Sequence, residues 1–208
     1  IVLFSNLGVM AQNEVFQWAG SIGGSSYDLG AAITTDAAGN VYSTGAIQGV
    51  AIDLDPGPLG YFVSANGGYD TYIHKVNANG YFEWAKTFGG TQNDVGLAIA
   101  LDGDGNIFIT GHFFGTTDFD PGAGVTELTS NGARDVYILK LDANGNFLWA
   151  RSFGAANDDY GHSIATDANG NVYVAGKFKG TVDLDPGVAE LNFTSNGNDD
   201  MFIQKLDG

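Results

Sequence analysis

The chain has no cysteine and few basic residues. The missing cysteine excludes a disulfide framework and a thiolate metal site, and it leaves the redox compartment undecided. Only 8 basic residues stand against 24 acidic ones, which gives a formal net charge of −16. A field of that sign repels phosphate backbones and anionic lipid headgroups, so nucleic acid is excluded as an expected partner. No apolar run reaches the ~18 residues of a membrane-spanning helix, and no transmembrane span is predicted.

Proline is also scarce, whereas glycine is abundant and regularly placed. The 208 residues include 4 Pro and 32 Gly. Glycine that recurs at fixed positions indicates ordered, turn-rich structure, because a disordered low-complexity tract would not place it so regularly. The aromatic share of 12% is typical of packed strands.

The first twelve residues, "IVLFSNLGVMAQ", have the pattern of a secretory signal. An apolar stretch is followed by small residues, with Val9 and Ala11 at the positions that a signal peptidase reads. Neither a basic segment nor an initiator Met precedes it. We therefore predict a clipped signal peptide over 1–12, ahead of a segment of an exported bacterial protein at 13–208. The alternative is a buried N-terminal strand.

Three copies of one unit fill the rest of the chain, at 15–80, 81–145 and 146–208. Each copy contains an F-x-W sequence, and the tryptophans are Trp18, Trp84 and Trp149. The stretches "DTYIHKV", "DVYILKL" and "DMFIQKL" begin 65 residues apart. Units of this length rarely fold alone, so the copies are expected to stack on one another.

Each copy is expected to fold as four antiparallel strands. Aromatic residues alternate with others in the F-x-W runs, and the D-x-[YF]-I-x-K runs are apolar on both faces, as in a strand covered from two sides. Turn sequences rich in Asp, Asn and Gly separate these runs. In the first copy the strands are predicted at 29–36, 40–47, 71–76 and 81–88, and Val15–Ile22 is predicted as an additional outermost strand. An all-β fold of propeller blades follows, since helical solenoids need a 3.6-residue period that is missing.

The recurring sequences resemble a known family. The combination of D-x-[YF]-I-x-K-[VL], N-G-x-[FL]-x-W, G-x-x-x-[DN]-D-x-G and D-x-x-G-N-[VI]-[YF]-x-x-G is similar to the SBBP-type bacterial β-propeller repeat, from residue 15 to 208. The resemblance implies an extracytoplasmic, non-catalytic repeat module. Natural propellers have about 4 to 8 blades. We therefore expect an open three-blade arc, part of a larger propeller, or a homodimer that closes a six-blade ring.

One pentapeptide, D-x-D-P-G, departs from the plainest form of that repeat. Its carboxylates at i and i+2 are oxygen ligands of the kind that Ca²⁺ requires, but a complete site needs about 6 to 8 oxygens. The alternative is a tight turn in which the first aspartate accepts backbone N–H groups. The candidate calcium ligands are Asp53, Asp55, Asp118, Asp120, Asp183 and Asp185.

Other recurring polar residues have structural explanations. "LDGDGN" at 101–106 looks like a calcium loop, yet its counterparts in the other copies lack the middle aspartate, so a hairpin explains all three. Two further sets of aspartates recur. The first could ring the axial opening or bond backbone amides in turns, and the second is expected to bond backbone amides in the same way. The first set is Asp28, Asp94 and Asp159, and the second is Asp70, Asp135 and Asp200. Lys75, Lys140 and Lys205 recur in register, and we predict that they pair with one of these carboxylates.

The sequence indicates no enzyme class. The three histidines, His74, His112 and His162, occupy different repeat positions, and no hydrolase, zinc-protease or nucleotide-binding motif is present. The preferred hypothesis is a non-enzymatic module for binding or display at the bacterial cell surface, with a protein or carbohydrate ligand. Two alternatives are a polysaccharide hydrolase or lyase that uses copy-specific residues such as His112 or His162, and a structural array stiffened by Ca²⁺. No other cofactor is expected.

Overall fold

The computed structural model describes residues 15–187 and 189–207, and every regular element in them is a β-strand. The predicted signal peptide at 1–12, with its alternative as a buried strand, lies outside the described residues. None of the described segments forms a helix long and apolar enough to cross a membrane.

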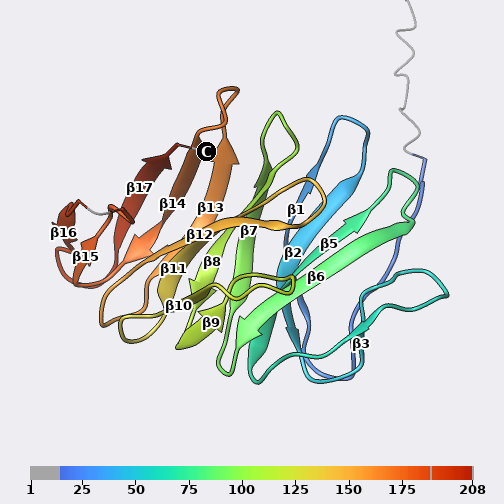
Figure 1. The fold of residues 1–208 in the computed structure, drawn as a ribbon, viewed down its shortest axis with the longest axis horizontal. Helices are drawn as coiled ribbons and strands as arrows, with labels where there is room; N and C mark the ends of the chain where they lie inside the picture. Colours follow the sequence, from blue (N-terminus) through green and yellow to red (C-terminus); the bar gives the residue numbers. More distant parts are fainter. Residues whose placement is uncertain (1–14, 188, 208) are drawn as a thin grey trace, which may run out of the picture.

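Two complete blades and one of three strands make up the fold (Figure 1). The first consists of β1 (Leu29–Thr35), β2 (Val41–Gln48), β5 (Tyr69–Val76) and β6 (Phe82–Gly90). The second consists of β7 (Val95–Leu101), β8 (Ile107–Phe113), β11 (Asp135–Leu141) and β12 (Phe147–Phe153). The third consists of β13 (Tyr160–Thr166), β14 (Val172–Phe178) and β17 (Asp200–Leu206). All neighbouring strands are antiparallel, and the four strands predicted in the first copy are confirmed.

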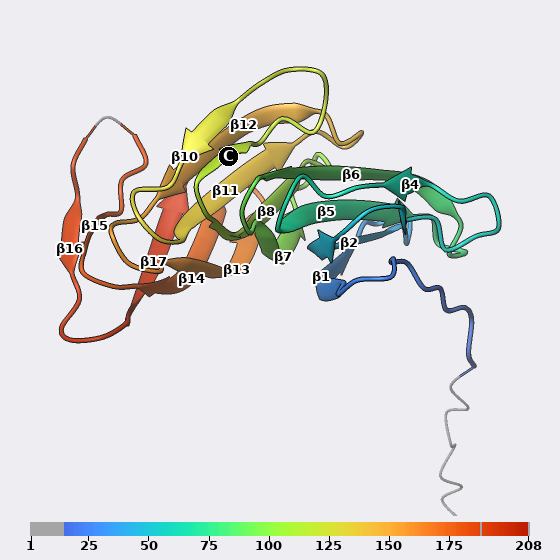
Figure 2. The same ribbon diagram turned by 90° about the horizontal axis from the view of Figure 1, so that it is seen from below.

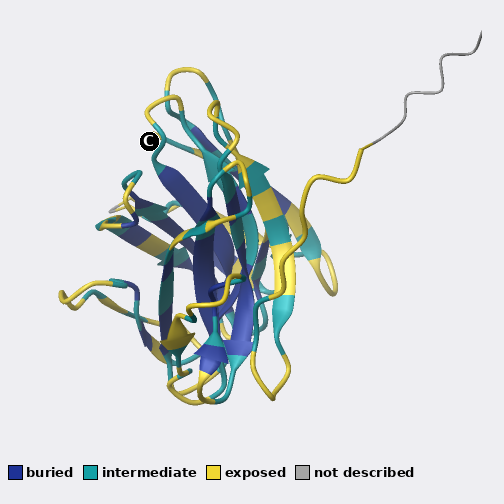
Figure 3. Ribbon diagram, turned by 90° about the vertical axis from the view of Figure 1, so that its right-hand side faces the viewer, coloured by how far each residue is buried: buried dark blue, intermediate teal, exposed yellow. Residues whose placement is uncertain are grey.

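The blades pack face to face. Their first strands, β1, β7 and β13, lie next to one another, and Figure 2 shows the three sheets following each other along an arc. In β11, Tyr137 and Leu139 face a core shared with Ile73 of the first blade, whereas Val136 and Ile138 face a core shared with Val174 of the third. The middle strands are therefore buried on both faces, as their continuous apolar runs predict, and Figure 3 shows the buried residues concentrated on them.

The tryptophans occupy matching places. Trp84 meets Tyr42 edge-on with ring centroids 6.2 Å apart, and Trp149 meets Phe108 at the same separation. A Cβ on Gly145 would lie 3.2 Å from the Trp84 ring, and one on Gly80 would lie 2.7 Å from the Trp18 ring. Tryptophan therefore covers the hairpin turn of the following blade, and the absence of a side chain at that turn makes the contact possible. The Trp84 and Trp149 rings are only partly buried.

The predicted strand Val15–Ile22 is wrong. This segment forms no strand, although Gly23 makes an isolated bridge to Asp53. The equivalent strands β6 and β12 each have a full-length partner, β5 and β11, on one side. In the described part of the chain no third strand of a blade lies beside 15–22. A strand needs a paired neighbour to satisfy its backbone, and the sequence pattern alone does not supply one.

A small hairpin fills the long loop between the second and third strands of each blade. The three hairpins are β3 (Ile52–Asp53) with β4 (Phe62–Val63), β9 (Thr116–Asp118) with β10 (Glu127–Thr129), and β15 (Thr181–Asp183) with β16 (Asn192–Thr194). The outer strand β6 runs onto β9 of the next blade through the pair Gly89 and Asp118. These hairpins carry the D-x-D-P-G sequences, so each pentapeptide lies where one blade meets the next.

Candidate functional site

The first aspartate of each D-x-D-P-G closes its hairpin. Asp118 Oδ1 accepts hydrogen bonds from Asp120 N at 3.0 Å and Thr126 N at 2.8 Å. Asp53 and Asp183 accept the same two bonds at the same distances. The second aspartates, Asp55, Asp120 and Asp185, each accept the amide of the glycine two residues later, at 2.7, 2.7 and 2.8 Å. One oxygen of every carboxylate is thus used by the backbone of its own loop.

The middle residue of the pentapeptide explains why it recurs. Leu54 and Phe119 are completely buried, and Leu184 is nearly so. The Phe119 ring packs against Phe88 at 5.3 Å, Phe113 at 5.1 Å and Tyr137 at 5.1 Å between centroids. The two aspartates therefore hold a turn whose apolar centre is inserted into the core, and the unit is repeated because every blade needs this anchor.

Binding of Ca²⁺ by these six aspartates stays a prediction. Among residues 15–187 and 189–207, no group of three or more His, Cys, Asp or Glu side chains is placed to hold a metal ion. Each pair supplies two carboxylates, whereas Ca²⁺ takes about 6 to 8 oxygens.

Asp118→Ala is expected to lower the free energy of unfolding by about 1 to 3 kcal/mol, because two backbone N–H groups lose their acceptor. Chemical denaturation in a chelating buffer measures this, and Asp104→Ala, in the exposed part of a neighbouring turn, is the control. Unfolding with added Ca²⁺ tests the metal: a midpoint that rises in the wild type, and rises less in Asp118→Ala, would establish binding at this loop. An unfolding midpoint that Ca²⁺ leaves unchanged in both proteins would exclude Ca²⁺ binding by these loops.

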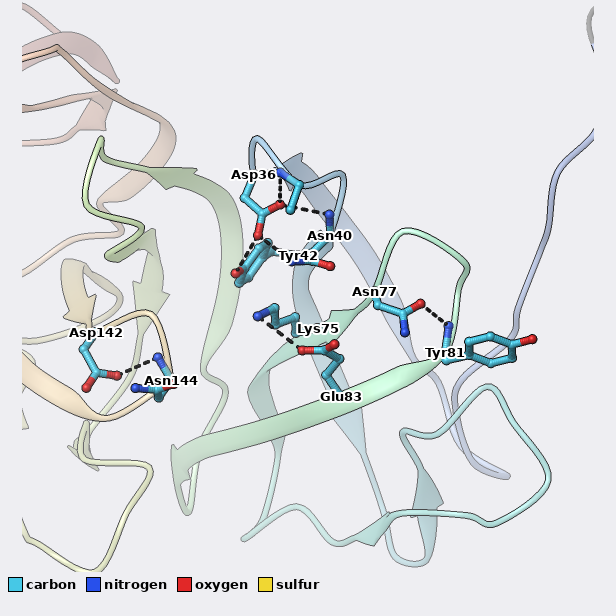
Figure 4. A network of polar contacts seen from close by, with 10 residues as sticks. Asp36, Asn40, Tyr42, Lys75, Asn77, Tyr81, Glu83, Asp142 and Asn144 are labelled. Atoms are coloured by element: carbon cyan, nitrogen blue, oxygen red, sulfur yellow. Dashed lines mark hydrogen bonds and ion pairs between the residues drawn. The ribbon is translucent and has the colours of Figure 1, made fainter.

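The hairpin turns follow the sequence prediction. Asp102 Oδ1 accepts bonds from Asp104 N and Asn106 N at 2.9 Å each, and Asp36 accepts from Ala38 N and Asn40 N at the same distance. Figure 4 shows the first-blade turn at Asp36 with its Asn40 and Tyr42 partners. "LDGDGN" is therefore a hairpin like its counterparts in the other copies.

The prediction that the recurring lysines pair with the recurring aspartates is wrong. Lys75 forms an ion pair with Glu83 at 3.3 Å (Figure 4). The partner that all three lysines share is an aromatic ring: Lys75 lies over Tyr42, Lys140 over Phe108 and Lys205 over Tyr173, at 5.2, 5.0 and 5.4 Å from the centroids. On a strand these lysines and rings are cross-strand neighbours, for example Tyr42 opposite Lys75, which makes the contact local.

The recurring aspartates bond backbone amides at the blade interfaces. Asp94 accepts from Gly90 N and from the Thr117 hydroxyl, both at 2.7 Å, and is fully buried. Asp159 accepts from Ala155 N at 2.8 Å and Lys179 N at 2.9 Å. Asp28 accepts from Gly24 N at 2.6 Å and Gln48 N at 3.4 Å. This set therefore caps turns, which was the structural alternative to a ligand ring around the axis.

In the second set, Asp200 Oδ2 accepts two hydrogen bonds from Asn196, from its backbone N at 3.0 Å and from its Nδ2 at 3.2 Å, whereas Asp70 and Asp135 accept one each. Asp70 Oδ2 and Asp135 Oδ2 each accept a backbone N–H at 3.0 Å, from Asn66 and Asn131, while their buried Oδ1 atoms have no hydrogen-bond partner in the described part of the chain. Burial raises the pKa of Asp70 to about 6 and that of Asp135 to about 7. The pKa of Asp94 is also raised to about 6, mainly by burial and partly by Asp70.

A cluster of polar and aromatic side chains breaks the threefold repetition around Tyr160. His112 meets the Tyr160 ring edge-on at 4.8 Å, and His162 stacks parallel to it at 5.7 Å. Lys177 Nζ lies 4.8 Å from the ring centroid, and Arg134 Nη1 donates to the Tyr160 hydroxyl at 3.4 Å. We call these five residues the Tyr160 cluster.

Two ion pairs hold the cluster in place. Arg134 contacts Asp158 at 3.2 Å, and Lys177 contacts Asp199 at 2.6 Å. Burial, and next the Arg134 charge, lower the pKa of His112 to about 4, so this imidazole is neutral at neutral pH. Its Nδ1 is buried without a partner in the described part of the chain. The cluster joins the second and third blades and contributes fixed hydrogen-bonding groups at their interface.

A pocket of about 290 Å³ lies beside the cluster. Asp158, Tyr160, Lys177, Lys179 and Asp199 line it together with small residues. Sequence reasoning selected His112 and His162 only as examples of copy-specific residues, and it missed Tyr160, Arg134 and Lys177. A position-by-position comparison of the three copies identifies Tyr160 as specific to the third copy, because Leu29 and Val95 occupy the same position in the first and second copies.

Comparison with known proteins supports the repeat. The family model of the SBBP type, described as a beta-propeller repeat, matches residues 148–177. An uncharacterized WD repeat-containing protein of Acanthamoeba polyphaga mimivirus is 29% identical over 109 residues, which is 46% of this chain and 8% of that protein. The regulatory protein FlaEY of Caulobacter vibrioides is 27% identical over 148 residues, which is 66% of this chain and 16% of that protein.

The matched regions thus cover less than a fifth of either relative's length. The similarity to these two relatives therefore concerns the repeat. The same repeat is identified by the sequence comparison of the copies, by the strand pattern and by the family model. Residues 148–177 match the SBBP-type β-propeller repeat, and the chain is an all-β array of three copies of one sequence unit, of which this match lies in the third.

Proposed function

We propose that this chain is a non-enzymatic binding module of an exported bacterial protein, displayed at the cell surface, and that it binds a carbohydrate at the Tyr160 cluster. The observation that carries the proposal is the cluster itself. It is the place where side chains of both charges and an aromatic ring gather at positions that the other copies do not share. Binding residues are frequently carried by loops on a rigid scaffold. Tyr160 and Lys177 lie in the strands β13 and β14, and the loop residues of the site are Arg134, Asp158, Lys179 and Asp199.

The lining of the pocket favours a polar ligand. Asp158 and Asp199 offer acceptors, and Lys177, Lys179 and the Tyr160 hydroxyl offer donors. A sugar needs both kinds of group within reach of neighbouring hydroxyls. Arg134 and Lys177 are paired with Asp158 and Asp199, whereas Lys179 forms no ion pair among the described residues. Lys179 can therefore meet a carboxylate, and a sugar that carries one is the preferred ligand class.

Binding fits the cluster better than hydrolysis. Glycoside cleavage uses two carboxyl groups placed about 5 to 10 Å apart across the scissile bond, one of them protonated. Asp158 and Asp199 are each held by a cation, and the Lys177 partner lowers the pKa of Asp199 below its usual range. A carboxyl group held ionised is a poor proton donor.

The test is a screen of neutral and uronic-acid-containing glycans, with affinity and turnover measured together. Lys179→Ala and Tyr160→Ala should weaken binding of a captured uronic-acid glycan at least tenfold, which corresponds to about 1.4 kcal/mol. Lys205→Ala removes a cation in the same blade and should leave affinity unchanged. Turnover of a glycan would favour the hydrolase or lyase. If all three variants bind the glycan as tightly as the wild type, the ligand does not bind at the Tyr160 cluster. Capture of a protein and of no glycan would contradict the proposed carbohydrate ligand.

A further inference from the structure

Two buried carboxyl groups adjoin the Tyr160 cluster at the interface between the second and third blades. Asp135 is the first residue of β11, Asp159 immediately precedes β13, and both residues are completely buried. The ion pairs of the cluster go to other aspartates, so neither of these two carboxyl groups has an ion-pair partner in the described part of the chain. The pair therefore needs a structural or functional explanation of its own.

Asp159 ties together three loops that carry residues of the site. Its Oδ1 accepts a hydrogen bond from Lys179 N at 2.9 Å, and its Oδ2 accepts one from Ala155 N at 2.8 Å. Its own backbone N–H donates to Arg134 O at 2.7 Å. Asp159 therefore fixes the backbone of Lys179 and of Arg134 relative to Asp158, its neighbour in the chain.

Asp135 contributes the second carboxyl group from β11. Its Oδ2 accepts the Asn131 amide at 3.0 Å, in the loop that carries Arg134, and the Asn131 side chain donates to Gly154 O at 3.3 Å. A Cβ on Gly154 would clash with the Asp135 carboxyl group, so this group rests against the backbone that leads to Asp158. Its Oδ1 is buried without a hydrogen-bond partner among the described residues, which disfavours the ionised form.

We propose that Asp135 and Asp159 are positioning residues of the carbohydrate site, and that protonation of this pair strengthens the attraction of the site for an acidic sugar. The inference rests on the function proposed above. The physical reason is charge, because an ionised pair places negative charge beside the loop of Lys179 and opposes the arrival of a sugar carboxylate. A protonated pair leaves the attraction by Lys179 unopposed, while the hydrogen bonds that hold the loops remain.

The pair gains and loses its proton in an ordinary pH range. Burial raises the pKa of Asp135 to about 7, with a smaller contribution from Asp159, so Asp135 is protonated at pH 5 and ionised at pH 8. Burial also raises the pKa of Asp159, and nearby aspartates add to this. The other charged or titratable groups of the region come from the surrounding loops, from β8, from β13 and from β14. They are Arg134, Asp158, Lys179, Asp199, His112, His162 and Lys177.

The interface between the first and second blades offers a matched control. Asp70 and Asp94 occupy the equivalent positions there, and Asp94 N donates to Tyr69 O at 2.7 Å, as Asp159 N does to Arg134 O. Uncharged side chains stand at the positions of Arg134, Asp158 and Lys179, namely Tyr69, Asn93 and Phe114. The carboxyl pair is thus common to both interfaces, whereas the charged loop residues belong to the second. Asp70→Asn should therefore leave sugar binding unchanged.

The first test is the affinity of the protein for an oligomer of galacturonic acid and for a neutral oligomer of galactose, measured by calorimetry at pH 5 and pH 8. A uronic acid has a pKa of roughly 3.5, like other α-substituted carboxyl groups, and is ionised at both pH values. Wild-type affinity for the acidic oligomer should be at least about fivefold weaker at pH 8, the low end of coupling between sites. Asp135→Asn should lose most of this difference by binding more tightly at pH 8, and Asp70→Asn should behave as the wild type. The neutral oligomer should show no such difference in any of the three proteins.

A second readout needs no ligand. The Lys179 amide donates to Asp159, so its NMR signal in the free protein should move with pH, with a step near pH 7 that Asp135→Asn lacks and Asp70→Asn retains. Equal pH profiles of affinity for the wild type and Asp135→Asn, or the same change in Asp70→Asn, would overturn the inference. If neither oligomer binds, the proposed ligand class is wrong, and the NMR step alone decides whether the pair acts on the loop of Lys179. Absence of that step in the wild type would overturn the inference on its own.

Discussion

Phe119→Ala is expected to lower the free energy of unfolding by about 3 to 5 kcal/mol. The ring is fully buried among Phe88, Phe113 and Tyr137, and it enters the core from the D-x-D-P-G turn. Removing it leaves a cavity between the first and second blades, because the two sheets are held apart by their other side chains and cannot collapse onto it. Urea denaturation followed by circular dichroism measures the loss.

Two further variants test whether the loss of stability comes from the buried anchor residue of the pentapeptide. Val125→Ala lies in the same loop with its side chain exposed, and the free energy of unfolding should stay within about 0.5 kcal/mol of the wild type. Leu184→Ala changes the equivalent anchor in the third blade and should cost about 2 to 5 kcal/mol, toward the low end because Leu184 is less completely buried than Phe119. A loss below about 1 kcal/mol for Phe119→Ala would contradict the role of the pentapeptide as a core anchor.

The blades were predictable because their signals are local and repeated. The alternation in β6 and β12, the two-sided apolar runs in β5 and β11, and the Asp-to-Asn hairpin turns each specify a strand or a turn from neighbouring residues. The segment Val15–Ile22 carries the same pattern as β6 and still forms no strand. Pairing depends on a neighbour that the pattern does not contain, so sequence similarity between copies cannot decide it.

The candidate site was less predictable because it depends on contacts between blades. His112 and Lys177 stand at equivalent repeat positions, and both approach Tyr160, one from the neighbouring blade and one from its own sheet. The lysine partners illustrate the same limit: a carboxylate was predicted from charge, but the cross-strand register places an aromatic ring nearer. The partners of a side chain depend on the register between strands and on the stacking of the blades. A linear comparison of the copies determines neither the register nor the stacking.

Asp135→Asn should change how stability depends on pH. Burial raises the pKa of Asp135 to about 7, with a smaller contribution from Asp159, and the pKa values of Asp70 and Asp94 are about 6, all above the ordinary value of 3.8. Between pH 4 and 7 the folded chain therefore binds more protons than the unfolded chain, and stability from these groups is lost as the pH rises. An asparagine stays neutral, so the variant should gain on the wild type by roughly 2 to 4 kcal/mol between pH 5 and pH 8.

Urea unfolding at both pH values isolates this difference, since groups common to the two proteins cancel. Asn can still accept the Asn131 amide through its carbonyl oxygen, and it removes the charge facing Asp159. The matched control is Asp200→Asn, at the same repeat position in the third blade, where the side chain is in contact with water and accepts the equivalent Asn196 amide at 3.0 Å. Its pH dependence should follow the wild type. Parallel curves for Asp135→Asn and the wild type would mean that folding draws no proton onto Asp135, and the polar surroundings of the blade interface would then have to stabilise an ionised carboxylate.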